Sequence, residues 1–180
     1  MNLLKKTTNI SLLISLVILL TVACTETTTA SQISQEDITD ASKLHTRAQS
    51  ASAEDQQVAA HMYNQGEKAA QQKNWGKAAK LYGESILLNP TMGSLIGYAE
   101  ASIFIKRQAN NKTTQQQAKQ RDLTYAAQVL DAAVQFAEKT NQENTKAGLQ
   151  TANQKSACIK EYLQTGGIGE QCAFIEEVLK

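Results

Sequence analysis

Proline and aromatic residues are scarce in this chain, and their scarcity bears on the fold class. Only one of the 180 residues is proline, and Phe, Trp and Tyr together make up 5% of the sequence. Proline interrupts helices and aromatic residues are enriched in strands, so little in the composition breaks helices or favours a sheet. Ala, Gln, Leu and Lys are abundant instead, and these residues lose little rotamer freedom in a helix. We therefore expect helices and no sheet.

An excess of charge of either sign is also missing. The chain carries 18 Lys and Arg against 17 Asp and Glu, for a net charge of +1. Surfaces that bind nucleic acids or attach generally to membranes require a basic excess. The charge balance therefore predicts no nucleic-acid partner. Hydrophobic residues make up 42% of the chain, which is ordinary for one globular domain with tails.

Motifs that mark common enzymes and metal sites are absent from the sequence. It contains no Gly-rich phosphate loop, no nucleophile elbow and no HExxH helix. His45 and His61 lie far apart and show no metal-ligand spacing. The carboxylates of Glu67, Glu84 and Glu100 are more typical of solvated helix faces than of an acid/base pair. We predict a protein that is not an enzyme and holds no metal or cofactor.

The N-terminus lacks a hydrophobic run long enough to span a bilayer. A short basic lead with Lys5 and Lys6 precedes a mainly apolar run from Ile10 to Leu20, and small residues follow. This is the three-part layout of a secretory signal. A transmembrane helix needs about 20 apolar residues, and the chain turns polar at Thr25. We expect residues 1–23 to be a cleaved signal peptide.

The end of this segment, Val22-Ala23-Cys24, resembles the lipobox of bacterial lipoproteins, although Thr21 stands where Leu is usual. The resemblance implies that Cys24 receives diacylglyceryl before cleavage and anchors the chain to a membrane of the cell envelope. Thr25 is not the Asp that retains such proteins at the inner membrane, which implies an outer-membrane lipoprotein facing the periplasm or the cell surface. The alternative is an ordinary signal peptide cut near position 23 or 30, with the cysteine incidental.

Residues 24–50 are interpreted as the lipidated cysteine and a flexible tether. They are rich in Thr, Ser, Gln and Asp, and they hold few large apolar groups to bury. Ile38 and Leu44, with the Ala-rich stretch around them, are compatible with one helical turn or more. The helical domain is then predicted over residues 51–180.

A helical hairpin is predicted over residues 52–90. The spacing of Ser52 and Asp55 is that of a capping box. Small and apolar residues then recur at steps of three and four, which is the helical period. A turn is expected at Lys73-Asn74, and Asn89-Pro90 ends the second helix.

The small residues of this hairpin resemble a tetratricopeptide repeat (TPR), a 34-residue helix pair. Met62 and Gln65 depart from the family, which usually has Trp and Leu there. The resemblance implies that the matching residues pack the two helices together, and that Trp75 and Tyr82 are core residues rather than ligand-stacking ones. The repeat-packing residues are Gly66, Ala69, Trp75, Ala78, Tyr82, Ser85 and Pro90.

Weaker copies of the pattern follow. Residues 95–104 and 123–136 resemble a second helix pair in which the second helix is delayed by about 14 residues, nearly four turns. We expect longer helices with a short turn near Asn110-Asn111. A third helix carries Gly148, breaks at Gly166-Gly167, and resumes over 170–180. The predicted fold is all-α, with antiparallel hairpins stacked as a short TPR-like right-handed superhelix of about three units.

Cys158 and Cys172 are the remaining cysteines, an even pair in an oxidising compartment. They flank the glycine turn, and a disulfide there would contribute about 3 kcal/mol in the chain-entropy model. Two free thiols are the alternative, because disulfide geometry is strict.

The TPR resemblance implies a concave surface, lined by the first helix of each pair, that holds an extended peptide or a partner's helix. The leading hypothesis is a lipid-anchored envelope adaptor or scaffold, an assembly factor or pilotin-like chaperone, whose partner is an envelope protein or peptide. A regulator of a cell-wall (peptidoglycan) enzyme is the first alternative, and a ligand-binding protein or hydrolase is less favoured. Homodimerisation stays open, and a solvated helix face explains the polar candidates equally well. The candidates for partner binding are Tyr63, Asn64, Glu67, Gln71, Gly97, Ala101 and Phe104.

Overall fold

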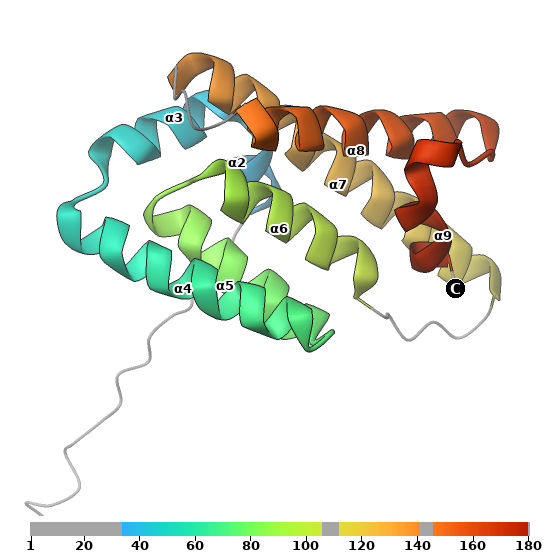
Figure 1. Cartoon of the computed structure of the whole chain (residues 1–180), viewed down its shortest axis with the longest axis horizontal. Coiled ribbons are helices and arrows are strands. Elements are labelled where there is room, and N and C mark those ends of the chain that lie inside the picture. The colour runs from blue at the N-terminus through green and yellow to red at the C-terminus, as the bar shows by residue number, and fades with distance from the viewer. Residues whose placement is uncertain (1–33, 106–111, 141–145, 180) are drawn as a thin grey trace, which may run out of the picture. The chain divides into compact units, whose positions relative to one another are not determined.

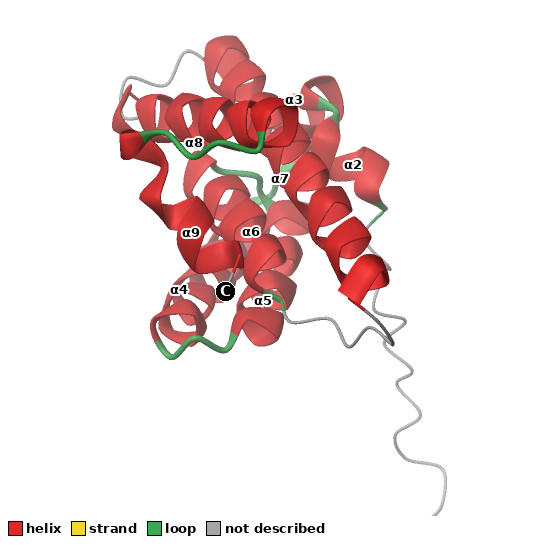
Figure 2. Ribbon diagram, turned by 90° about the vertical axis from the view of Figure 1, so that its right-hand side faces the viewer, coloured by secondary structure: helices red, strands yellow, loops and turns green. Residues whose placement is uncertain are grey.

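The computed structural model describes residues 34–105, 112–140 and 146–179, and over these ranges it contains helices and no strand (Figure 2). This confirms the all-α prediction. None of the described helices is both long and apolar enough to cross a membrane. The helices are α2 (Gln35–Thr39), α3 (Ala41–Ser50), α4 (Ala53–Gln71), α5 (Trp75–Leu88), α6 (Met92–Phe104), α7 (Lys112–Thr140), α8 (Lys146–Thr165), the 3-10 helix η3 (Glu170–Cys172) and α9 (Ala173–Leu179).

Helices α4 to α8 pack mainly against their neighbours in the sequence. Helices two apart also touch, α4 against α6 and α6 against α8. In Figures 1 and 2, α6 lies between the α4–α5 pair on one side and α8 on the other. Each hairpin therefore buries one face against the next, as expected for stacked helix pairs.

Local sequence signals set the bounds of these helices as predicted. Ser52 and Asp55 form the expected reciprocal capping box at the start of α4. Lys73 adopts a left-handed φ of 55° in the turn before α5, and the Asn74 side chain accepts from the Lys77 amide. Thr91, after the buried Pro90, caps α6. Side chains thus supply partners for backbone groups that lack one in the first turn.

Tyr82 joins three helices. Its ring is 2% exposed and lies so close to Gly66 of α4 and Gly97 of α6 that a Cβ there would be 2.8 Å and 2.6 Å from it. The Tyr82 hydroxyl donates to Glu67 at 2.5 Å. Ser85, one turn further along α5, donates to the carbonyl of Ala59 at 2.9 Å. The small residues of the first hairpin therefore let its helices pack closely around Tyr82.

The long helix α7 forms the centre of the larger core, with Leu123, Leu130 and Phe136 at most 1% exposed. It has 29 residues and begins at Lys112, which confirms the expected lengthening of the second helix of this pair. Helix α6 ends at Phe104 without a comparable extension. The turn predicted at 110–111 lies outside the described residues.

The last hairpin is stapled by a disulfide between Cys158 of α8 and Cys172 of η3, with the Cα atoms 5.4 Å apart. Both cysteines are buried. Helix α8 ends before Gly166, which takes a left-handed φ of 69° and donates its amide to the carbonyl of Tyr162. The structure thus contains the predicted pairing and the predicted glycine turn.

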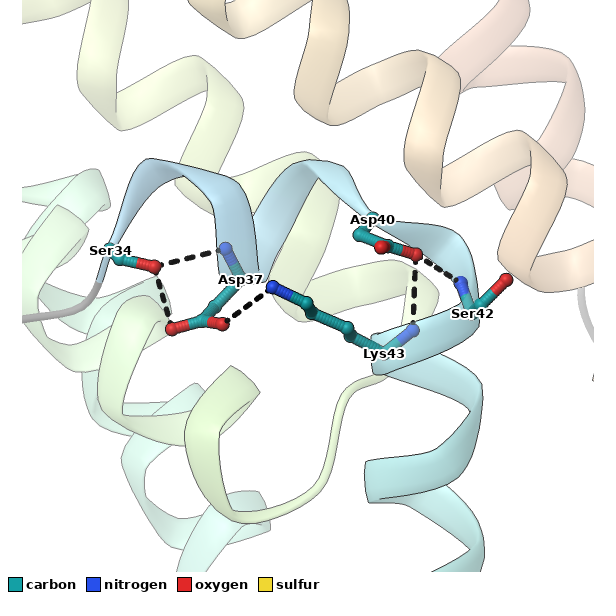
Figure 3. Close-up of polar contacts among 5 residues, drawn as sticks. All are labelled: Ser34, Asp37, Asp40, Ser42 and Lys43. Atoms are coloured by element: carbon teal, nitrogen blue, oxygen red, sulfur yellow. Dashed lines mark hydrogen bonds and ion pairs between the residues drawn. The ribbon is translucent and has the colours of Figure 1, made fainter.

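The tether boundary at residue 50 is wrong. Residues 35–50 form α2 and α3, and both helices pack against α7. Ile38 and Leu44 are 0% exposed. Figure 3 shows how the helix starts are capped. The Ser34 side chain accepts a hydrogen bond from the Asp37 amide, and the Asp40 side chain accepts one from the Ser42 amide. The segment is poor in apolar residues, but the few that it has reach one apolar face of α7, which the local composition could not show. Residues 24–33 lie outside the described part.

Because Tyr82 fills the space beside Gly66 and Gly97, we expect Gly66→Ala and Gly97→Ala each to lower the free energy of unfolding by about 1–3 kcal/mol, as for other overpacked cores. Gly76→Ala on α5 is the matched control, since its Cβ would meet no atom within 4 Å. It should leave stability unchanged or raise it by up to about 1 kcal/mol. Urea unfolding followed by circular dichroism measures all three variants, and equal midpoints for Gly97→Ala and Gly76→Ala would contradict the packing described.

If α3 belongs to the core, Leu44→Ala should cost about 2–5 kcal/mol of unfolding free energy, the usual range for removing a buried leucine side chain. Gln49→Ala, an exposed change in the same helix, should stay within about 0.5 kcal/mol of the wild type. Thermal melts of both variants test this. A Leu44→Ala protein as stable as the Gln49→Ala protein would restore the tether interpretation.

Candidate functional site

The four candidates on α4 differ in exposure. Asn64 and Gln71 are exposed, whereas Tyr63 and Glu67 are half-buried. The Tyr63 ring lies 5.8 Å from that of Tyr82 and covers Gly93 of α6, where a Cβ would be 3.1 Å away. The structure therefore brings Tyr63 and Glu67 together at the α4–α6 contact and leaves the two amides facing solvent.

The tyrosines of this cluster are electrostatically coupled to Glu67. Burial raises the pKa of Tyr82, and the hydrogen bond to Glu67 and its negative charge raise it further. The pKa of Tyr63 is raised in the same direction by burial, then by the charge of Glu67. Both phenols therefore stay protonated at neutral pH and act as neutral donors. The cluster packs α4 against α5 and α6 and is linked by the hydrogen bond from Tyr82 to Glu67.

Two candidates on α6 do not form a binding surface. Ala101 is 0% exposed, so the prediction that it contacts a partner is wrong. Gly97 is half-buried, and the space where its side chain would lie is occupied by the Tyr82 ring. The repeat spacing assigned α6 a solvent-facing groove, but α6 is covered by α4 and α5 on one side and by α8 on the other. Both positions therefore serve packing.

Phe104, the last candidate, lies at a different place, at the end of α6. Its ring stacks on Trp75 with 4.6 Å between centroids and 22° between planes. Both rings are half-buried. They line a cavity of about 530 Å³ together with Ile105 and Val178. The same cavity is bordered by charged side chains: Lys73, Lys119, Asp122 and Glu177.

A second cavity, of about 770 Å³, adjoins the disulfide. Its lining mixes polar and apolar groups, includes Gln150, Asn153 and Glu161 with both cysteines, and holds no aromatic side chain among the described residues. Pockets that bind small molecules are lined mostly by apolar and aromatic side chains, with a few polar groups that orient the ligand. The smaller cavity, with its stacked rings, meets that description better and is the candidate binding site. We call it the Trp75 cavity.

Several site residues had no signal in the sequence. Glu177 and Val178 enter the Trp75 cavity from α9, and Lys119 from α7. Lys155 of α8 forms an ion pair with Glu100 of α6. These positions are far apart along the chain, so only the stacking of the helices brings them together. The sequence pattern of the single helix predicted that Glu100 faces solvent, and it made no prediction for Lys119 or Lys155.

In the described ranges, no group of three or more His, Cys, Asp or Glu side chains is arranged to hold a metal ion. Comparisons of the chain with protein-family models, with curated proteins and with solved structures find no match.

The raised pKa of Tyr82 makes stability depend on alkaline pH. Because the unfolded chain ionises at about pH 10, it releases the phenolic proton before the folded state does, and folding stability must fall as the pH rises above that value. The loss should be smaller in Tyr82→Phe, where only other tyrosines contribute. Tyr125, whose pKa is raised by burial, is among them. Urea midpoints between about pH 8 and pH 11 measure the effect, and identical slopes for the two proteins would show that Tyr82 ionises freely when folded.

Proposed function

We propose that this protein is a lipid-anchored adaptor of the bacterial cell envelope that binds a partner protein or peptide, as an assembly factor or pilotin-like chaperone does. The observation that carries the proposal is the Trp75 cavity, because it presents a stacked aromatic pair that the fold leaves half-exposed. Aromatic side chains in pockets are the usual anchors of protein interfaces.

The lining of the Trp75 cavity supports a partner with an apolar anchor and polar flanks. Ile103, Ile105 and Val178 provide aliphatic surface beside the rings. Lys119, Asp122 and other charged side chains border it. An apolar core with a polar rim is the general anatomy of a non-obligate interface. The side-chain amides of Asn64 and Gln71 on α4 are exposed, but they are not part of this lining.

Two parts of the proposal, the lipid anchor and the relation to TPR proteins, rest on the amino-acid sequence. The lipobox-like ending at Cys24 supports attachment to an envelope membrane, and the small residues of the first hairpin support kinship to TPR proteins. The glycine and tyrosine packing at Gly66 and Tyr82 is what that kinship requires. Regulation of a peptidoglycan enzyme would use the same surface and differs only in the partner captured.

A small apolar molecule is the second candidate occupant. The volume of about 530 Å³ falls within the range of about 300–1,000 Å³ that small-molecule sites span. Trp75 is the only tryptophan of the chain, so its fluorescence reports occupancy by such a molecule directly.

The partner proposal is tested by placing a photo-cross-linking residue at Gln115, which lines the Trp75 cavity, in intact cells. The matched control is Gln128, an exposed glutamine on the same helix. Specific protein adducts should form from position 115 and not from 128, and Phe104→Ala should reduce them severalfold. They should also be lost with Cys24→Ser, which releases the chain from the membrane.

Equal adducts from both positions would show that the Trp75 cavity is not the partner surface. Adducts to synthases or hydrolases of peptidoglycan would select the enzyme-regulator alternative. If position 115 yields no protein adduct while purified protein shows a Trp75 fluorescence change with apolar small molecules, the adaptor proposal fails in favour of ligand binding.

A further inference from the structure

The segment from Gly166 to Leu179, called the C-terminal strap below, forms one wall of the Trp75 cavity. Figures 1 and 2 show α9 leaving α8 and running past the end of α6. Glu177 and Val178 of α9 line the cavity. Glu177 also forms an exposed ion pair with Lys73, in the turn between α4 and α5, at 3.5 Å. The strap therefore reaches from the last helix of the stack to the first hairpin.

Side-chain contacts hold the strap in place. Ile168, Phe174 and Leu179 are partly buried against the core, and the Lys155 ammonium lies 5.2 Å from the centroid of the Phe174 ring. Ile175 and Val178 are its buried anchors, at 0% and 7% exposure. Lys119 of α7 donates to the carbonyl of Leu179 at 2.9 Å. Among the described residues, the strap's backbone hydrogen bonds outside its own helices join it only to itself and to the end of α8.

The Cys158–Cys172 disulfide is the covalent hold on the strap, and it lies directly before α9. A helix of seven residues is not stable by itself, because it has too few turns to offset the cost of nucleation. Ordering the strap without the crosslink also costs backbone entropy for every residue in it. The disulfide fixes the residue before α9, and Ile175 and Val178 hold the helix against the core, so both contribute to the position of α9.

The disulfide lies beside a surface cavity, although Cys158 and Cys172 are only 5% and 4% exposed. Both cysteines, with Glu161 and Glu170, line the cavity of about 770 Å³. A dithiol reductant would attack one cysteine sulfur as its thiolate, form a mixed disulfide, and close its own disulfide with its second thiol. Two electrons and two protons then reside on Cys158 and Cys172 as thiols, and the dithiol is oxidised.

We propose that the Cys158–Cys172 disulfide is a redox lock on the C-terminal strap. In the oxidised protein it holds α9 as a wall of the Trp75 cavity. Reduction by a dithiol releases the strap, exposes Trp75 and removes the wall that a partner's anchor would pack against. The consequence for partner binding rests on the proposed function, whereas the movement of the strap does not.

The test uses the full chain carrying Cys24→Ser, in which Cys158 and Cys172 are the only cysteines. Hydrogen exchange is followed by mass spectrometry before and after treatment with dithiothreitol. Exchange of amides 170–179 should rise by at least about tenfold, while peptides from α5 stay protected. Acrylamide quenching of the single tryptophan should increase in parallel. The Cys158→Ala, Cys172→Ala double variant should match the reduced protein and not respond to dithiothreitol.

Two results would overturn the lock. One is a strap that remains protected after alkylation shows both thiols to be free. The other is loss of protection in α5 together with the strap, because the disulfide would then support the whole domain rather than the strap alone.

Cross-linking at Gln115 is read separately and distinguishes this inference from the proposed function. Strap release on reduction, with no adducts in either redox state, supports the lock and removes the adaptor function. If adducts form equally from the oxidised and reduced proteins, and reduction leaves the strap protected, the adaptor function is supported and the redox lock is ruled out.

Discussion

The fit of Tyr82 between two glycines determines how closely the first three helices of the stack can approach. Its ring lies against Gly66 and Gly97 with no room for a methyl group at either position. Ala-rich helices bury little apolar area per residue, so they gain stability only when their axes come close. The large Tyr82 side chain fills the space left by the two glycines, so the helix axes come close. The Tyr82 hydroxyl donates a hydrogen bond to Glu67. Tyr63 of α4 packs in the same way against Gly93 of α6.

Helix α7 integrates the rest of the domain. Helix α6 before it and α8 after it pack on its flanks, and α2 and α3 cover another part of its surface. The buried Ile38 and Leu44 show that the N-terminal helices belong to the core. This places the start of the folded domain at or before residue 34, so any tether between a lipid anchor at Cys24 and the domain is shorter than the composition of residues 24–50 indicates.

The Trp75 cavity arises where the stack ends rather than along a groove. The end of α6 brings Phe104 onto Trp75, α7 lines another part of the cavity, and the C-terminal strap adds Glu177 and Val178. The strap is held by its disulfide and by the side chains of one short helix and the turn before it, whereas the stack is held by many contacts between long helices. Local opening is therefore expected first at the strap. A binding site at this end would respond to the redox state of a bond that does not touch the ligand.

The amino-acid sequence alone determined the all-α class, the capping box at Ser52, the turn before Trp75 and the glycine break at Gly166. These features depend on residues close in the chain, so local propensity decides them. The sequence named Cys172 as the possible partner of Cys158 but left two free thiols open. The packing role of Gly66 was also readable, from its spacing to Tyr82 in one hairpin.

Only the tertiary structure decided that α2 and α3 join the core, that Ala101 is buried, and that Phe104 forms a cavity with a helix from the far end of the chain. The physical reason is the same in each case. Burial of a helix face depends on which other helices lie against it, and one period of apolar residues fits a groove and a covered layer equally well. Contacts between distant helices decide which faces are buried, and they form only when the helices stack. Examples are the contacts between Lys119 and Leu179 and between Glu100 and Lys155.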